Sequence, residues 1–143
     1  MAYTYDHPHF ALTVDAVIFS KSDIGLNVLL IRRSKEPFKD CWALPGGYVN
    51  IEETIDNAVN RELEEETNIS NVSLKKIDVF DAIDRDPRER TVSVAYYGFI
   101  NGSNMPVKAG DDAKDAKWFS VKNLPELAFD HSIILKKILE VLK

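Results

Sequence analysis

The feature that most constrains this sequence is a run of acidic residues inside an amphipathic segment. Glu62, Glu64, Glu65 and Glu66 fall within five consecutive positions. Like charges three and four residues apart on a helix repel by roughly 0.2–0.5 kcal/mol for each pair. The run is therefore either solvated surface or a cluster whose repulsion is offset by a bound cation.

The angular positions of these residues on a helix favour the cation. With Ile55 at zero and 100° per residue, Val59 falls at about 40°, so the apolar stripe is centred close to zero. Glu62 then lies at about 340° and Glu66 at about 20°, on the inward face, with Glu65 beside them at about 280°. Three carboxylates brought together out of water require a counter-charge, and such hard oxygen ligands suit Mg²⁺ or Mn²⁺.

Two consecutive glycines precede this helix. Gly46 and Gly47 follow Pro45, and we expect them to adopt a backbone conformation closed to other residues and to let the main chain approach a ligand closely. A carbonyl at this turn would supply a further oxygen ligand. An ordinary strand-to-helix turn explains one glycine more easily than two beside an acidic cluster.

From Gly47 onward the spacing resembles the Nudix box. The box reads Gly, five residues, Glu, seven residues, Arg-Glu, an aliphatic, any residue, Glu-Glu, any residue, Gly and an aliphatic. The matching residues are Gly47, Glu53, Arg61, Glu62, Leu63, Glu65, Glu66 and Ile69. Asn68 replaces the late glycine, and because Asn also tolerates the left-handed conformation that ends a helix, we expect the backbone to be preserved.

The resemblance implies an α/β fold, the Nudix-type α/β/α sandwich with a mixed β-sheet, in a single domain over residues 1–143. It also implies hydrolysis of a nucleoside diphosphate linked to another moiety. In that scheme Glu62 and Glu66 are the main metal ligands, Glu65 assists and the Gly46 carbonyl adjoins them. Glu53 and Arg61 pair and brace the loop against the helix.

Segments outside the box resemble the bacterial and archaeal ADP-ribose pyrophosphatases. They are TVDAVIF, PFKDCWALPGG, DRDPRERTVSVAYYG, AGDDAKDAKWFSV and LAFDHSIIL. This resemblance favours ADP-ribose, or a related nucleoside diphosphate sugar, as the substrate and AMP and ribose 5-phosphate as the products. The alternatives are a Nudix enzyme that cleaves nucleoside triphosphates and a non-catalytic domain that senses ADP-ribose.

The general base and the substrate ligands are less closely defined. Glu65 and Glu66 are candidate bases, with Glu65 preferred, and the distant loop acids Glu89, Asp111 and Asp112 are alternatives. The predicted substrate-binding residues are Gly47, Arg33, Arg85 and Arg90, and Arg88 lies in the same loop as the last two. Guanidinium groups suit phosphate oxygens and also stack on adenine.

The remaining pattern predicts strands around two helices. Residues 9–20 and 26–34 are expected to pair as a hairpin, and the helix that carries the box is expected at about 52–67. Further strands are expected at 72–83, 91–100 and 113–121, and a last helix begins after Asp130, which is a candidate N-cap. His7, His9 and His131 lack metal-ligand spacing and are interpreted as packing or interface residues.

The overall charge restricts the partners. The formal net charge is −5, which gives no general attraction to nucleic acid or to an anionic membrane. A single cysteine, Cys41, indicates a reducing cytoplasm, and no apolar run approaches the length of a membrane span. We expect a small-molecule nucleotide as the partner. The oligomeric state stays open, with a homodimer that uses residues 3–10 as an arm among the expected assemblies.

Overall fold

The computed structural model describes residues 2–23, 25–101 and 113–143. Two of the three alternative loop bases, Asp111 and Asp112, lie outside these ranges. The elements in chain order are β1 (Ala11–Ser22), β2 (Gly25–Arg33), β3 (Trp42–Ala43), β4 (Gly46–Tyr48), α1 (Ile55–Thr67), β5 (Lys75–Phe80), β6 (Thr91–Ile100), β7 (Ala113–Ser120) and α2 (His131–Val141).

The strands form one mixed sheet in the described part of the chain. Its order is β3-β2-β1-β6-β5, and β4 pairs with β1 while β7 pairs with β2. β1 and β6 run parallel, whereas the other pairs are antiparallel. β1 and β2 form the expected hairpin, in which Phe19 lies opposite Val28.

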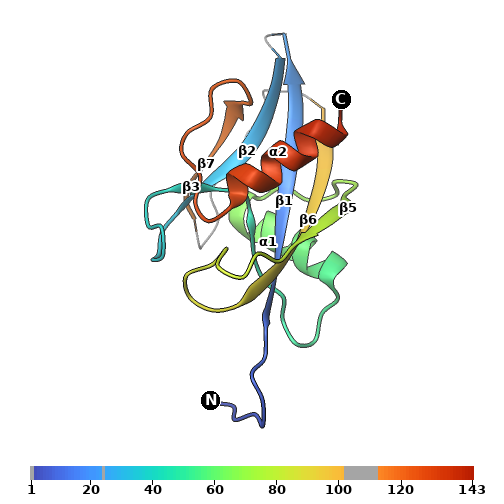
Figure 1. The fold of residues 1–143 in the computed structure, drawn as a ribbon. Helices are drawn as coiled ribbons and strands as arrows, with labels where there is room; N and C mark the ends of the chain where they lie inside the picture. Colours follow the sequence, from blue (N-terminus) through green and yellow to red (C-terminus); the bar gives the residue numbers. More distant parts are fainter. Residues whose placement is uncertain (1, 24, 102–112) are drawn as a thin grey trace.

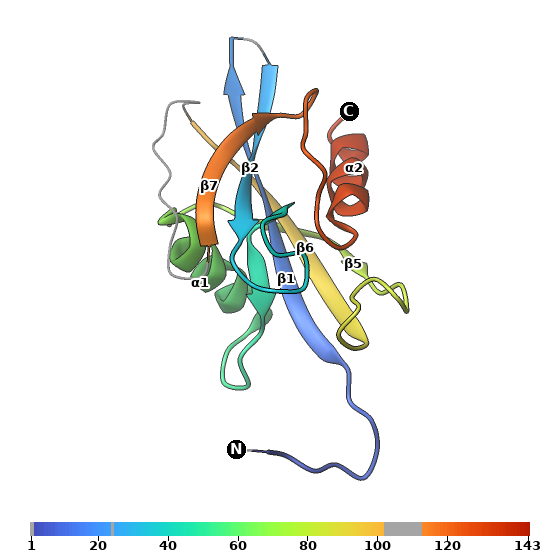
Figure 2. The ribbon, with the colours of Figure 1, turned by 90° about the vertical axis from the view of Figure 1, so that its left-hand side faces the viewer.

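Alternating side chains of β1 face two different hydrophobic clusters, because successive residues of a strand point to opposite faces. Val14, Ala16 and Ile18 pack in the cluster that contains Val59 and Leu63 of α1. The intervening β1 residues pack with α2, and this second cluster includes Val17, Phe19, Ile134, Leu135 and Ile138. One helix therefore covers each face of the sheet, as Figures 1 and 2 show, and the predicted α/β/α sandwich is confirmed.

The helix α1 begins later than predicted and ends where predicted. It begins at Ile55, and the side chain of Thr54 accepts a hydrogen bond from the Asn57 N–H at the N-cap. Its C-cap Asn68 has φ 63°, the left-handed conformation that the sequence predicted, and the Asn68 N–H donates to the Glu64 carbonyl at 2.8 Å. The residues before Thr54 form a turn, so the start at 52 was wrong.

The helix α2 begins at His131, directly after Asp130. Asp130 occupies the N-cap position, but its side chain makes no capping hydrogen bond within the described part of the chain. The carboxylate instead pairs with Arg85 through two hydrogen bonds of 2.9 and 2.7 Å. The predicted N-cap position is therefore confirmed, but the Asp130 side chain serves Arg85, since a two-pronged bond to a guanidinium is stronger than a bond to a backbone N–H. Neither of the helices in the described residues combines the length and the apolar character needed to cross a bilayer.

Candidate active site

Two of the four clustered glutamates face inward from α1. The side chain of Glu62 is 13% exposed, and Glu66 is 6% exposed. The side chain of Glu65 is 48% exposed, and Glu64 is also exposed. The inward placement that the helical angles predicted is thus confirmed for Glu62 and Glu66, whereas Glu65 lies at the edge of the helix.

The inward glutamates open onto a cavity of about 340 Å³, here called the glutamate cavity. Its lining includes Arg33, Gly46, Gly47, Glu62, Glu66 and Arg88. The Gly46 N–H donates to Glu66 Oε1 at 2.7 Å, so β4 is fastened directly to α1. The structure therefore brings together the glycine turn, two box carboxylates and two guanidinium groups.

Close packing explains the two glycines. Of the glycines that the structure describes, Gly25 has a positive φ of 130°, whereas Gly46 and Gly47 do not. A Cβ at Gly46 would lie 2.1 Å from the Val14 carbonyl oxygen, and a Cβ at Gly47 would lie 2.7 Å from Glu62 Cδ. The expectation of a special backbone conformation at this turn was wrong, because what the site requires is space between β4, β1 and the glutamate.

Glu53 and Arg61 form the brace that the family resemblance implied. Arg61 Nε donates to Glu53 Oε2 at 2.9 Å, and Nη2 donates to Oε1 at 2.6 Å. Glu53 Oε1 also accepts from the Asn50 N–H at 2.8 Å. The hydrogen bonds from Arg61, and then that from Asn50, lower the pKa of Glu53 to about 2. The same contacts with Glu53 raise the pKa of Arg61 despite partial burial.

Arg61 also forms hydrogen bonds with two other carboxylates of the box, those of Glu62 and Glu65. Its Nη1 donates to Glu62 Oε1 at 2.8 Å and to Glu65 Oε2 at 3.1 Å. Among the residues that the structure describes, no three His, Cys, Asp or Glu side chains form a group that could hold a metal ion. The expected convergence of Glu62, Glu65 and Glu66 is therefore absent from this arrangement, in which Glu65 is bonded to Arg61 at the exposed edge of the helix.

The predicted arginines separate into two groups. Arg33 lines the glutamate cavity, with its Nε donating to the Pro37 carbonyl at 2.8 Å and its guanidinium 4.9 Å from the centre of the Phe129 ring. Arg85 is buried against Asp130 and lines a second cavity of about 630 Å³. Arg90 lies over the Phe10 ring at 4.6 Å. Neither Arg85 nor Arg90 is among the described residues that line the glutamate cavity.

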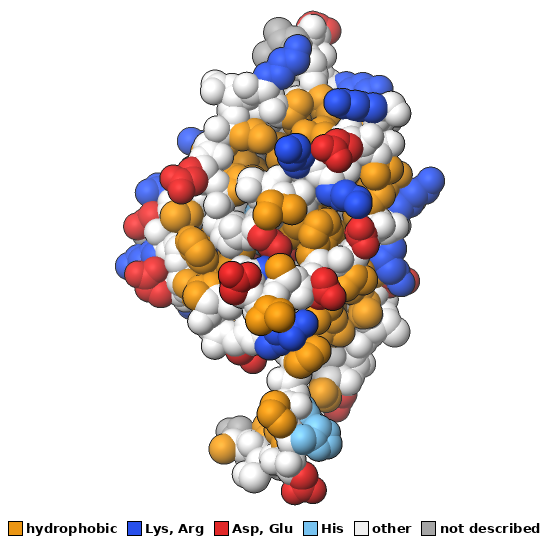
Figure 3. All heavy atoms as spheres, viewed as in Figure 1, with side chains coloured by type: hydrophobic (Ala, Val, Ile, Leu, Met, Phe, Trp, Pro, Cys, Tyr) orange, Lys and Arg blue, Asp and Glu red, His pale blue; other side chains and the backbone are white. Residues whose placement is uncertain are grey.

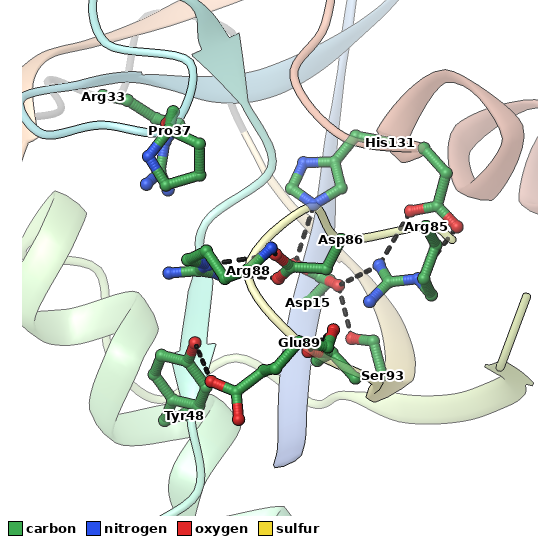
Figure 4. A network of polar contacts seen from close by, with 12 residues as sticks. Asp15, Arg33, Pro37, Tyr48, Arg85, Asp86, Arg88, Glu89, Ser93 and His131 are labelled. Carbon is green, nitrogen blue, oxygen red and sulfur yellow. Dashed lines mark hydrogen bonds and ion pairs between the residues drawn. The ribbon is translucent and has the colours of Figure 1, made fainter. Parts of the chain in front are cut away.

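Arg88 is the arginine of this loop that lines the glutamate cavity. The sequence did not distinguish it from Arg85 and Arg90. Two hydrogen bonds to Asp86, of 3.0 and 2.7 Å, hold its guanidinium, and these bonds raise the pKa of Arg88. The guanidinium lies 5.1 Å from the centre of the Tyr48 ring and 5.3 Å from that of Phe129. Tyr48 also donates to Glu89 Oε2 at 3.4 Å, which places that alternative base beside the cavity wall (Figure 4).

A buried polar cluster behind the cavity has no counterpart in the sequence interpretation. His131 Nδ1 accepts from the Leu44 N–H at 3.0 Å, and Nε2 lies 3.3 Å from Asp15 Oδ1. Ser93 Oγ donates to Asp15 Oδ2, which also lies 4.0 Å from Arg85 Nη2 (Figure 4). Burial opposes ionisation of Asp15, but His131, Ser93 and Arg85 outweigh it and lower the pKa of Asp15. His131 is thus a buried packing residue, as expected, and its two ring nitrogens also contact the Leu44 N–H and Asp15.

Comparison with known proteins identifies the family. The NUDIX domain matches residues 9–142 of this chain. An ADP-ribose pyrophosphatase of Methanocaldococcus jannaschii is 44% identical over 132 residues, which cover 92% of this chain and 73% of that protein. The ADPR responsive transcriptional repressor NtrR of Acinetobacter baylyi is 34% identical over 136 residues, and the match spans 92% of this chain but 54% of the repressor.

Solved structures agree with this assignment. The NUDIX domain of Shewanella oneidensis NrtR, complexed with ADP-ribose, has a TM-score of 0.87 and 32% identity over 97% of this chain and 94% of that one. A bifunctional NMN adenylyltransferase/ADP ribose pyrophosphatase of Francisella tularensis, complexed with AMP and a Mn ion, has a TM-score of 0.83 and 34% identity over 97% of this chain and 44% of that one. The chain belongs to the Nudix hydrolase family.

Proposed function

We propose that this protein hydrolyses the pyrophosphate bond of ADP-ribose, or of a related nucleoside diphosphate sugar, to AMP and ribose 5-phosphate with Mg²⁺ or Mn²⁺. The observation that carries the proposal is the joint placement of Glu62, Glu66, Arg33 and Arg88 in the wall of one cavity. The identity to the archaeal pyrophosphatase and the likeness to the domain complexed with ADP-ribose support this substrate class.

The donor set of the glutamate cavity fits a divalent cation. Two carboxylates on successive turns of α1 line the cavity together with the backbone at Gly46, and hard oxygen donors of this kind are those that Mg²⁺ and Mn²⁺ prefer. The exposed Glu65 would complete the set by turning away from Arg61. A bound cation would supply charge neutralisation at the phosphates and a water of lowered pKa.

The protein side chains would supply orientation and proton transfer. Arg33 and Arg88 would hold phosphate oxygens, and Arg88 is already oriented for this by its two bonds to Asp86. Glu65 is the proposed general base, because it is exposed enough to approach a water and its helix also carries Glu62 and Glu66. Such positioning and electrostatic stabilisation account for most of the catalysis in phosphoryl transfer.

Charge-neutral substitutions of the inward glutamates test the proposal. Glu62→Gln and Glu66→Gln are each expected to lower the rate of AMP release by about 100-fold or more, since even outer partners of metal ligands affect activity by roughly 10–100-fold. The matched control is Glu64→Gln on the exposed face of the same helix, which should keep near-wild-type turnover. AMP release is measured by chromatography at saturating Mg²⁺, with thermal unfolding as a check on the fold. Near-wild-type rates in both inward variants would exclude the site.

A substrate panel then identifies what is hydrolysed. ADP-ribose, other nucleoside diphosphate sugars and nucleoside triphosphates are incubated with and without Mg²⁺ or Mn²⁺, and products are separated by chromatography. AMP from ADP-ribose supports the proposal, whereas release of pyrophosphate from triphosphates alone would favour the triphosphate-cleaving alternative.

A second candidate function is ADP-ribose sensing without turnover, which the similarity to the ADPR responsive repressor favours. The distinguishing measurement is calorimetric titration with ADP-ribose, followed by recovery of the ligand. Intact ADP-ribose after prolonged incubation with Mn²⁺ would indicate a sensor. The four box acids Glu53, Glu62, Glu65 and Glu66 are all present, which favours the enzyme.

We further propose a cytoplasmic protein whose partner is a small nucleotide and neither nucleic acid nor a membrane. The net charge of −5 supports this, and Figure 3 shows basic and acidic side chains mixed on the face that carries α2. The N-terminal residues extend away from the body in Figures 1 and 2 and expose Tyr3, Tyr5 and Phe10, which suits the proposed homodimer arm. Sedimentation measurements on the whole chain test the dimer.

A further inference from the structure

The buried polar cluster joins four parts of the fold at one point. Asp15 comes from β1, Ser93 from β6, His131 from α2 and Arg85 from the loop between β5 and β6. Each of the four residues is at most 8% exposed. Charged groups at such depth are costly unless they are paired and hydrogen-bonded, and every member of this cluster has a partner within it.

One branch of the cluster leads to the glycine turn. Because His131 Nδ1 accepts from the Leu44 N–H, the imidazole proton is on Nε2, which faces Asp15 Oδ1. Asp15 in turn lies opposite Gly46 in the β1–β4 pairing. A Cβ at Gly46 would stand only 2.7 Å from Asp15 Oδ1, so the carboxylate and this backbone are in close contact. The next contact along this path is the bond from Gly46 N–H to Glu66.

The other branch leads to Arg88, one of the two arginines in the wall of the glutamate cavity. Arg85 is fixed by its two bonds to Asp130, the residue that precedes α2, and by its proximity to Asp15. The same loop continues into Asp86 and Arg88, and Arg88 lines the glutamate cavity. The start of α2 thus contacts the segment before the glycine turn through His131 and the arginine-bearing loop through Asp130. Figure 4 shows His131 and Arg85 on either side of Asp15.

We propose that this buried cluster is a positioning device, in which His131 sets the place of the Gly46 segment and Arg85 sets the place of the Arg88 loop. Neither residue lines the glutamate cavity among the residues described, so both act through others. The inference rests on the proposed function for the ligands of the cavity, which are a cation at Glu62 and Glu66 and a phosphate at Arg88. The competing explanation is a cluster that stabilises the core and has no effect on the site.

The His131 branch is tested by His131→Gln, which removes the ring acceptor for the Leu44 N–H. The matched control is Ile138→Val, a mild truncation of a buried apolar side chain on the same helix that is not a member of the buried polar cluster. We expect His131→Gln to weaken Mn²⁺ binding about tenfold in calorimetric titration with Mn²⁺ alone. It should also speed hydrogen exchange at the Leu44 and Gly46 amides, whereas Ile138→Val changes neither.

The Arg85 branch is tested by Arg85→Lys, which keeps the charge and loses the two-pronged bond to Asp130. We expect faster exchange at the Arg88 amide, which now donates to Asp86 Oδ1 at 2.9 Å. The KM for ADP-ribose should rise about tenfold, while Mn²⁺ affinity stays within twofold of the wild type. This split between the branches is not expected of a cluster that only adds stability.

The outcomes separate the two proposals. Wild-type Mn²⁺ affinity and wild-type exchange at Gly46 in His131→Gln, with only a lower melting temperature, would overturn the positioning device. An unchanged Arg88 amide in Arg85→Lys would overturn its second branch. A wild-type protein that does not hydrolyse ADP-ribose would refute the proposed function. The positioning device would still be tested, because hydrogen exchange requires neither substrate nor metal.

Discussion

Gly46 and Gly47 are adjacent, but they are required for different reasons. A Cβ at Gly47 meets the end of the Glu62 side chain, which can rotate, whereas a Cβ at Gly46 meets the Val14 backbone at 2.1 Å. Gly47→Ala is therefore expected to lower AMP release at least tenfold with little loss of stability, because it displaces Glu62. Gly46→Ala is expected to cost about 2 kcal/mol or more of stability. Urea unfolding and AMP release are measured for both variants. Equal stability of the two variants would contradict the different reasons given for the two glycines.

Individual residues were predictable only where a local rule fixes them. The helical period placed Glu62 and Glu66 inward, and the structure confirms it. No local rule distinguishes Arg85 from Arg88 in one loop, yet the first is buried against Asp130, 45 positions along the chain, and the second lines the cavity. For the same reason the sequence placed Asp130 correctly at the N-cap of α2 but did not reveal that its side chain pairs with Arg85, because that distant partner leaves no mark in the neighbouring sequence.

The helix α1 is braced against its preceding loop by Glu53 and Arg61, and this brace should give acid-labile stability. The pKa of Glu53 is about 2 in the fold against an ordinary value of 4.5. The stabilisation is therefore complete above pH 4.5, where both folded and unfolded chains are ionised, and it is lost as the pH falls toward 2. Urea unfolding should show wild type more stable than Glu53→Gln at pH 7, with a smaller difference at pH 3. A difference independent of pH would contradict the brace.

The C-terminal end of α1 depends on the left-handed conformation of Asn68. Asn68→Ala is expected to cost about 1 kcal/mol of unfolding free energy, because a Cβ without a compensating polar group disfavours this conformation. Asn68→Gly restores the family residue and should match or exceed the wild type. Chemical denaturation of the pair provides the measurement, and an alanine variant as stable as the glycine variant would show that the backbone there is unstrained.

At the level of elements, the C-terminal end of α1 was predicted from its residue chemistry, whereas its N-terminal end was missed although Thr54 is a residue type that caps helices. Asn68, which adopts the left-handed conformation, marks the end of α1. Its start was expected at about 52, but the Asn50 N–H bond to Glu53 closes a turn there and leaves Thr54 as the cap. The strand expected at 72–83 is β5, Lys75–Phe80, since its outer residues do not pair with β6.

In the whole molecule, the three-layer arrangement follows from β1, whose alternating residues serve two cores. That much could be inferred from the apolar run at residues 9–20 and from the two amphipathic helices. The order of the strands could not, because the parallel β1–β6 pairing joins residues about 80 positions apart, such as Ala11 and Thr91. Long-range pairing of this kind leaves no periodic signal in the sequence.

The same layering predicts how metal binding affects the stability of the whole domain. The glutamate cavity lies between α1 and strand β4, and β4 pairs with the central strand β1. A cation bound there therefore ties a covering helix to the sheet and is available only in the folded state. A ligand at 100 times its Kd stabilises a fold by about 2.7 kcal/mol if the unfolded chain does not bind it.

Mn²⁺ in that excess should therefore raise the unfolding free energy by about 2.7 kcal/mol, and EDTA should reverse the effect. Glu66→Gln should lose most of this gain, because it removes the carboxylate that is fastened to Gly46, whereas Glu64→Gln on the exposed face should keep it. Urea denaturation of the three proteins with and without Mn²⁺ makes the comparison. Equal stabilisation of the two variants would mean that the ion binds elsewhere, since the site between helix and sheet is the one that Glu66 completes.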